Sequence, residues 1–110
     1  MGLAAGHAAA TLEALLANLK PYQAIHSCLC MGSSIGMALG AAHAGMTPAL
    51  AVIGDGTFTH SGMAPLLDVA RENANVKVFI LDNSIVAMTG GQHPEGQLGA
   101  DRIAANLLGQ

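Results

Sequence analysis

Two stretches decide the fold of this chain: ALAVIGDG at residues 49–56 and VKVFILDN at residues 76–83. Each is an apolar run, typical of a buried β-strand, that ends in polar residues. Between them, residues 62–73 have apolar side chains at helical spacing, and Ser61 or Thr59 can cap this helix. The order strand, helix, strand predicts a parallel crossover unit, in which both strands end at the same edge of the sheet.

The rest of the chain continues this alternation of strands and helices. Four further segments are predicted: a short strand at 25–29 and helices at 8–19, 35–44 and 98–108. A polar, Gly-rich loop is expected at residues 82–97. The sequence therefore predicts an α/β fold with a parallel sheet in a three-layer α/β/α arrangement. In such sheets, ligands bind outside the carboxyl ends of the strands.

The composition indicates one small domain with little polar surface. The chain has 110 residues, of which 52% are hydrophobic, 10% charged and 3% aromatic. The charged fraction is far below the usual value of about a quarter. It favours a domain that buries one face against another domain or subunit, so we expect an oligomer. The alternative is a small Ala-rich globule that is simply poor in charge.

Charge and cysteine content argue against several classes of protein. The net charge is −3 and the four basic residues form no cluster, which argues against nucleic-acid binding. Residues 28–54 are apolar but contain Ser33 and Pro48, so a membrane span is not expected. Cys28 and Cys30 are too close together for an ordinary disulfide and too few for a zinc site. Because no secretion signal is visible, we expect a cytoplasmic protein with reduced thiols.

Two polar residues follow the two strands of the central unit and suit a metal ion. Asp55 follows the first strand, and Asn83 follows the second, with 26 residues between Gly56 and Asn83. Carboxylate and amide oxygens at the tips of neighbouring strands suit a Mg²⁺ ion that itself holds a diphosphate. The backbone N–H groups of Gly56 and Thr57 begin the next helical region, where an anion is favoured. The alternative is an ordinary strand-ending turn at Asp55 and an ordinary loop Asn at 83.

The longer stretch at residues 51–92 resembles a known cofactor-binding motif. It reads AVIGDGTFTHSGMAPLLDVARENANVKVFILDNSIVAMTGGQ and resembles the thiamine diphosphate-binding motif, in which GDG is followed by a downstream Asn. The THSG segment and the LDN…AMTGGQ loop are similar to 2-oxoacid:ferredoxin oxidoreductases, nearest to the indolepyruvate ferredoxin oxidoreductase α subunit. CMGSSIG at residues 30–36 resembles the same domain. The match covers about residues 26–94.

The resemblance implies a fold and a set of cofactor ligands. Residues 1–110 would form a partial, truncated thiamine diphosphate-binding domain of the diphosphate-binding type. Asp55, Asn83 and the backbone carbonyl of Ile85 would bind Mg²⁺. Four small or hydroxyl-bearing residues would line or approach the diphosphate: Gly54, Gly56, Thr57 and Thr89.

The resemblance also implies roles on the reactive side of the cofactor. Cys30, Met31 and Gly32 would lie on the loop that faces the thiazolium ring. His60 would lie near the substrate, as a candidate catalytic residue. Two other interpretations stay open. Cys28 and Cys30 can equally be buried, small hydrophobic residues. A single His before a helix can equally be a cap or a surface residue.

For the intact enzyme, the resemblance implies oxidative decarboxylation of a 2-oxoacid, such as indolepyruvate or another aryl pyruvate, to an acyl-CoA. Ferredoxin would accept the electrons and coenzyme A the acyl group. A separate pyrimidine-binding domain or subunit would supply the activating Glu. An iron–sulfur cluster would lie in a partner domain, because the chain has no four-Cys run. The isolated chain is expected to be inactive.

Two other functions remain open from the sequence. One is a non-oxidative thiamine diphosphate-dependent 2-oxoacid decarboxylase subunit, because decarboxylases of sulfopyruvate have a similar DN…TGGQ loop. The THSG and CMG segments favour the oxidoreductase. The other is a catalytically inactive, truncated cofactor-binding module that keeps the fold.

Overall fold

A computed structural model describes residues 2–5, 23, 25–85, 90–93 and 99–109 of the chain. The elements run in the order β1 (Gly2–Ala5), β2 (Ser27–Cys28), α2 (Ser33–His43), β3 (Ala49–Gly54), α3 (Asp55–Thr57), the π-helix η1 (Phe58–Gly62), α4 (Met63–Arg71), β4 (Val76–Leu81) and α5 (Ala100–Leu108). The helix expected at 8–19 lies outside the described residues.

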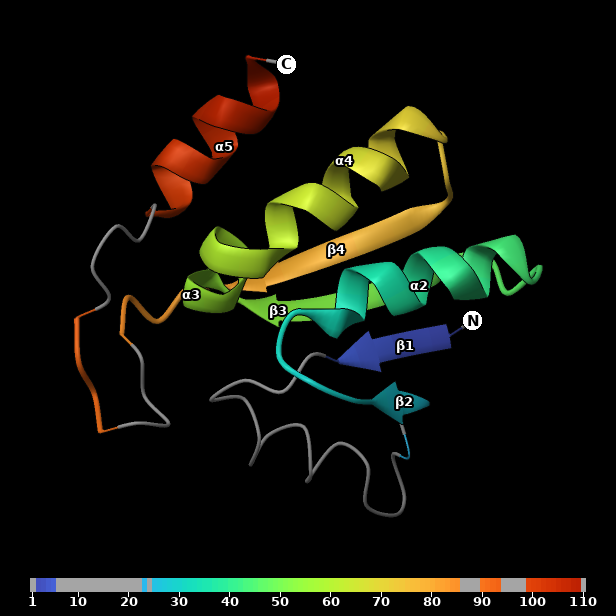
Figure 1. Ribbon diagram of the computed structural model, residues 1–110, viewed down its shortest axis with the longest axis horizontal. Helices are drawn as coiled ribbons and strands as arrows, with labels where there is room; N and C mark the ends of the chain where they lie inside the picture. The colour runs from blue at the N-terminus through green and yellow to red at the C-terminus, as the bar shows by residue number, and fades with distance from the viewer. Residues whose placement is uncertain (1, 6–22, 24, 86–89, 94–98, 110) are drawn as a thin grey trace.

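The strands form one parallel sheet in the order β2-β1-β3-β4 (Figure 1). In the pairing of β3 with β4, Ala49 lies opposite Val76 and Gly54 lies opposite Leu81. Helical segments connect β2 to β3 and β3 to β4, as parallel strands require. The predicted α/β fold with a parallel sheet is therefore confirmed.

The core lies between the sheet and helix α2. Ala49, Ala51 and Ile53 alternate along β3 and are buried, and they belong to the same apolar cluster as Ile35 and Ala38 of α2. Alanine side chains on both elements let the helix approach the strands closely. The remaining buried members of the cluster come from three other helices: Phe58, Val69 and Ile103.

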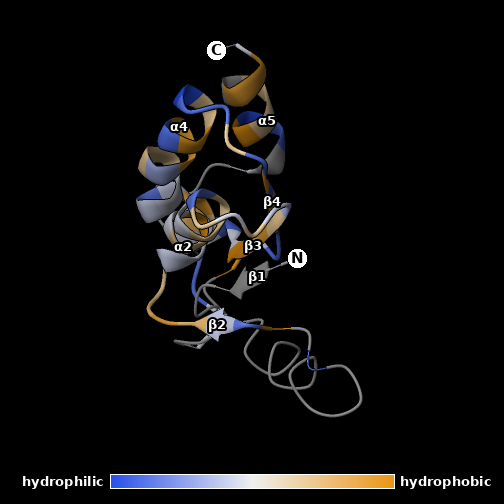
Figure 2. Cartoon of the chain, turned by 90° about the vertical axis from the view of Figure 1, so that its right-hand side faces the viewer, coloured by the Kyte–Doolittle hydropathy of each residue, from blue (hydrophilic) through white to orange (hydrophobic). Residues whose placement is uncertain are grey.

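The opposite face of the sheet is more open. Figure 2 shows α2 and α4 on the same side of the sheet, with α5 next to α4. On the other face, Leu50 and Val52 are half-buried, whereas Phe79 and Leu81 of β4 are 50% and 44% exposed. Side chains of a strand alternate between the two faces, so this face of β4 presents apolar groups to water.

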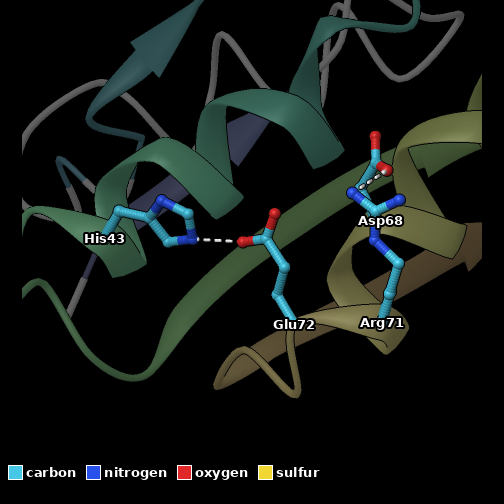
Figure 3. Close-up of polar contacts among 4 residues, drawn as sticks. All are labelled: His43, Asp68, Arg71 and Glu72. Carbon is cyan, nitrogen blue, oxygen red and sulfur yellow. Dashed lines mark ion pairs between the residues drawn. The ribbon is translucent and has the colours of Figure 1, made fainter.

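Two ion pairs lie at the C-terminal ends of helices α2 and α4 (Figure 3). His43, the last residue of α2, pairs with Glu72 just after α4, with His43 Nε2 at 2.5 Å from Glu72 Oε2. Arg71 lies 3.8 Å from Asp68 one turn earlier in α4. All four side chains are well exposed, so these pairs contribute little to the free energy of unfolding. The packing of α2 and α4 on the sheet depends mainly on the core.

The helix after β3 begins earlier than its sequence predicts. Its first residue is Asp55, directly after the strand, and Gly54 is its extended N-cap without a side-chain hydrogen bond. Neither Ser61 nor Thr59 caps it, because both lie inside the π-helix. A continuous helical segment thus runs from 55 to 71, through the wider turns of η1.

The observed boundaries of several other elements agree more closely with the predicted ones. Strand β4 has the predicted bounds, and helices α2 and α5 are within two residues of theirs. The strand predicted at 25–29 is shorter than expected, and strand β1 was not predicted. In the described parts of the chain, no helix combines the length and apolarity needed to cross a membrane.

The π-helix depends on a glycine that faces a buried ring. A Cβ atom at Gly62 would lie 2.5 Å from Cδ2 of Phe58 and 3.2 Å from Cδ1 of Ile53. We expect Gly62→Ala to lower the free energy of unfolding by about 1–3 kcal/mol, because the buried ring cannot move aside. Gly36→Ala is the matched control. A Cβ there has no neighbour within 4 Å, so it should raise that free energy by about 0.5–1 kcal/mol. Equal effects in urea unfolding would contradict this packing.

Candidate metal and diphosphate site

The ends of β3 and β4 place two loops at one edge of the sheet. Gly54 and Leu81 are paired in register, so the residues that follow them leave the sheet side by side. Asp55 is the first residue beyond β3, and Asp82 and Asn83 are the first beyond β4. This is the edge at which ligands of parallel α/β sheets bind.

The two segments are joined by a hydrogen bond to Asp55. The backbone N–H of Ser84 donates to Asp55 Oδ2 over 3.0 Å, although the residues are 29 positions apart. Asp55 is only 2% exposed, and a buried carboxylate requires polar partners. The hydrogen bond therefore fixes the carboxylate beside the loop that contains Asn83.

The loop after β4 is built from two overlapping turns. The Ser84 N–H also donates to Asp82 Oδ1 over 3.0 Å, and the Ile85 N–H donates to Asn83 Oδ1 over 3.2 Å. In both cases a side-chain oxygen accepts from the N–H two residues later, as in an Asx turn. An amide oxygen can accept two bonds, so Asn83 Oδ1 keeps the capacity to bind a cation. Ser84 has a left-handed backbone, with φ +58°.

The first helical turn after β3 presents backbone to the same edge. Asp55, Gly56 and Thr57 form α3, the start of the continuous helical segment, where backbone N–H groups favour an anion. A Cβ at Gly56 would have no neighbour within 4 Å, so the backbone there is approachable. The Thr59 hydroxyl donates to the Asp55 carbonyl over 3.0 Å, which ties the first turn to η1.

A second loop packs directly against this helical segment. Gly32 precedes α2 with φ +86°, and a Cβ at Gly32 would lie 2.8 Å from the Cβ of Ser61. Both the backbone conformation and the contact require glycine. The neighbouring side chains of Cys30 and Met31 are exposed, and the Ser33 N–H and hydroxyl donate to the Cys30 carbonyl over 3.1 and 2.7 Å.

The candidate catalytic histidine lies on the π-helix. His60 is exposed, and its Nδ1 is hydrogen-bonded to Ser61 Oγ. π-Helical turns occur frequently at functional sites because they displace side chains from regular α-helical positions. Ser61 touches Gly32 as well, so the His60 turn and the loop at 30–32 form one packed unit.

The structure thus brings most of the predicted site residues to one edge of the sheet. They lie in three segments, at 30–32, 54–60 and 83–85. Thr89 lies outside the described residues. Sequence reasoning missed Asp82, Ser84 and Ser61, although an Asp two residues before a Ser is a recognisable Asx-turn signal.

The donor set fits a hard cation and an anionic cofactor. Asp55 and the Asn83 loop carry oxygen atoms of the kind that Mg²⁺ prefers, and a Cβ at Gly56 would meet no neighbour within 4 Å. The described residues hold no group of three or more His, Cys, Asp or Glu side chains that could bind a metal. A metal at Asp55 would therefore need further oxygen ligands outside such a group.

Comparison with protein families indicates a thiamine diphosphate-binding domain. The sequence model of the family described as "Thiamine pyrophosphate enzyme, C-terminal TPP binding domain" matches residues 4–106 of this chain. The chain belongs to this family of thiamine diphosphate-binding domains. The resemblance inferred from the GDG…Asn motif and its neighbouring segments is confirmed.

Several relatives carry the name indolepyruvate oxidoreductase subunit IorA. The Archaeoglobus fulgidus protein is 42% identical over 76 residues, which cover 68% of this chain and 12% of that protein. The Methanothermobacter marburgensis protein is 44% identical over 75 residues, which cover 67% of this chain and 12% of that protein. The Pyrococcus abyssi protein is 34% identical over 95 residues, which cover 74% of this chain and 15% of that protein. The chain thus spans only a small part of these relatives' length. No solved structure matches it.

The contact between Gly32 and Ser61 can be tested by a double-mutant cycle. We expect Gly32→Ala to lower the free energy of unfolding by about 1–3 kcal/mol, because it meets both a left-handed backbone and the Ser61 Cβ. Ser61→Gly should relieve the steric part, giving an interaction energy of about 0.5–3 kcal/mol in urea unfolding of the double variant. Additive effects of the two substitutions would show that the segments do not touch.

Proposed function

We propose that this chain binds the diphosphate of thiamine diphosphate through Mg²⁺. Asp55 supplies a carboxylate oxygen, Asn83 its amide oxygen and Ile85 its backbone carbonyl. The observation that carries the proposal is the hydrogen bond from Ser84 to Asp55, which holds the segments after β3 and β4 together. Both segments lie within residues 4–106, which the family model matches.

The proposed diphosphate contacts lie at the start of the helical segment. Gly54, Gly56 and Thr57 line the diphosphate, and Thr89 approaches it from the loop after β4. The unoccupied space beside Gly56 and the N-terminal end of a helix support this position. The four basic residues of the chain lie away from the GDG motif in sequence, so the metal ion supplies the main neutralising charge.

The reactive side of the cofactor is assigned to the unit formed by the loop at 30–32 and η1. Cys30, Met31 and Gly32 face the thiazolium ring, and His60 faces the substrate. The close contact between Gly32 and Ser61 supports this arrangement, because it fixes the distance between loop and helix. His60 is exposed and hydrogen-bonded through Nδ1, so its ring has a defined orientation.

For the intact enzyme we propose a 2-oxoacid:ferredoxin oxidoreductase that acts on indolepyruvate or another aryl pyruvate. When bound, thiamine diphosphate would supply a nucleophilic carbanion and an electron sink for the decarboxylation of the 2-oxoacid. Ferredoxin then accepts two electrons and coenzyme A accepts the acyl group. This chain contributes orientation and charge neutralisation. The relatives' name, indolepyruvate oxidoreductase subunit IorA, supports this substrate class.

The proposal includes partners for this domain. A pyrimidine-binding domain or subunit supplies the activating Glu, and an iron–sulfur domain carries electrons towards ferredoxin. The assembly is oligomeric and cytoplasmic. The half-exposed side chains of Phe79 and Leu81 support burial of this face against another part of such an assembly.

Calorimetric titration with thiamine diphosphate and Mg²⁺ tests the cofactor assignment. We expect binding that requires Mg²⁺ in the wild-type chain. Asp55→Ala should weaken it by about 100-fold or more, because loss of even an outer partner of a metal ligand costs about 10–100-fold. Asp68→Ala is the matched control, since Asp68 is an exposed residue on α4 that pairs with Arg71, and it should bind as the wild type does. Metal-independent binding, or retained binding in Asp55→Ala, would refute the assignment.

Activity of the assembled enzyme tests the reaction class. With a pyrimidine-domain partner added, we expect reduction of a redox dye that depends on both an aryl 2-oxoacid and coenzyme A. Release of CO₂ and an aldehyde without dye reduction would indicate the non-oxidative decarboxylase instead. Binding of the cofactor without either product would indicate a module without turnover.

A further inference from the structure

Asp82 has no role in the proposed set of cofactor ligands, yet it organises the loop that contains them. Its Oδ1 accepts two hydrogen bonds from Ser84, one from the backbone N–H and one from the hydroxyl, each over 3.0 Å. Both bonds hold the same residue two positions further along the chain. Asp82 thus contacts Ser84 through both its backbone N–H and its hydroxyl.

That conformation is unfavourable for serine without such support. Ser84 has φ +58°, in the left-handed region that residues with a Cβ seldom adopt. An Asp side chain that accepts from the N–H two residues later closes an Asx turn, which favours this kind of reversal. The two bonds from Ser84 to Asp82 compensate for the strained backbone.

The same N–H of Ser84 also reaches the buried carboxylate of Asp55. Its distance to Asp55 Oδ2 is 3.0 Å, equal to its distance to Asp82 Oδ1, so one donor is shared between two carboxylates. Two carboxylates this close repel each other unless a donor or cation lies between them. The shared N–H thus sets the position of the loop relative to Asp55.

We propose that Asp82 is a positioning residue that holds Ser84 in its left-handed conformation, and thereby keeps Asn83 and Ile85 at the distance from Asp55 that a shared Mg²⁺ requires. The metal part of this inference rests on the proposed function. Asp82 acts through Ser84 and makes no bond to the metal. The alternative is that the carboxylate acts by its charge or as a direct metal ligand.

Asp82→Asn and Asp82→Ala distinguish these roles. Asparagine keeps the side-chain oxygen that closes the Asx turn but lacks the charge, whereas alanine lacks both. In the metal-free chain, amide exchange of Ser84 should accelerate about tenfold or more in Asp82→Ala, because local opening becomes easier. It should change by less than about threefold in Asp82→Asn, in which the turn persists. Unchanged exchange in Asp82→Ala would overturn the proposal.

Mg²⁺ titration in the presence of thiamine diphosphate gives the second measurement. Asp82→Ala should weaken Mg²⁺ binding by about 10–100-fold, as expected for a residue that orients a ligand, whereas Asp82→Asn should retain most of the affinity. Equal losses in the two variants would overturn positioning in favour of charge or direct ligation. Asp68→Ala controls for loss of an acidic side chain elsewhere on the protein.

A third variant tests whether Asp82 affects Mg²⁺ binding through the backbone conformation of Ser84. Ser84→Gly removes the penalty of the left-handed backbone, so Asp82→Ala should weaken Mg²⁺ binding less in the Ser84→Gly background than in the wild type. The same loss in both backgrounds would overturn the role of Ser84. If the wild-type chain shows no Mg²⁺-dependent binding, the proposed function and the metal part of this inference both fail. Amide exchange in the metal-free chain would still decide whether Asp82 holds the loop.

Discussion

The parallel register of β3 with β4 is the constraint on which the candidate site depends. It places Gly54 opposite Leu81, so two segments far apart in sequence leave the sheet at one point. A shift by one residue would turn every side chain of β3 to the other face. Ala49, Ala51 and Ile53 would then leave the core, so burial of these side chains stabilises the register. The geometry of the site is therefore a product of the apolar core.

Much of the fold could be predicted because its central strands carry strong local signals. The strand at 76–81 is rich in β-branched residues and was predicted with its observed bounds. Strand β1 gave no such signal, because Gly2–Ala5 consists of small residues and one Leu. Its conformation follows from pairing with two neighbouring strands, which depends on tertiary contacts. The helix start at Asp55 was missed because its N-cap is Gly54, without the side-chain hydrogen bond that marks most helix starts.

The candidate site could be predicted only in part, for a related reason. Asp55 and Asn83 stand at strand ends, where topology alone brings residues together. The roles of Ser84 and Asp82 depend on a backbone with positive φ, which sequence patterns specify poorly outside glycine. The contact of Ser61 with Gly32 depends on how η1 packs, and a π-helix has no distinct sequence period.

The close approach of Gly32 and Ser61 has a consequence for attempts to redesign this domain. A side chain at 32 would need a left-handed backbone and a smaller neighbour at 61, so the two positions cannot vary independently. In a mutant library that randomised both positions, most members would be destabilised by this steric conflict. Diversity is better introduced at Leu29, Met31 and His60, whose side chains are exposed beside the fixed pair. In this way the contact separates the positions that preserve the shape of the site from those that can change what it accepts.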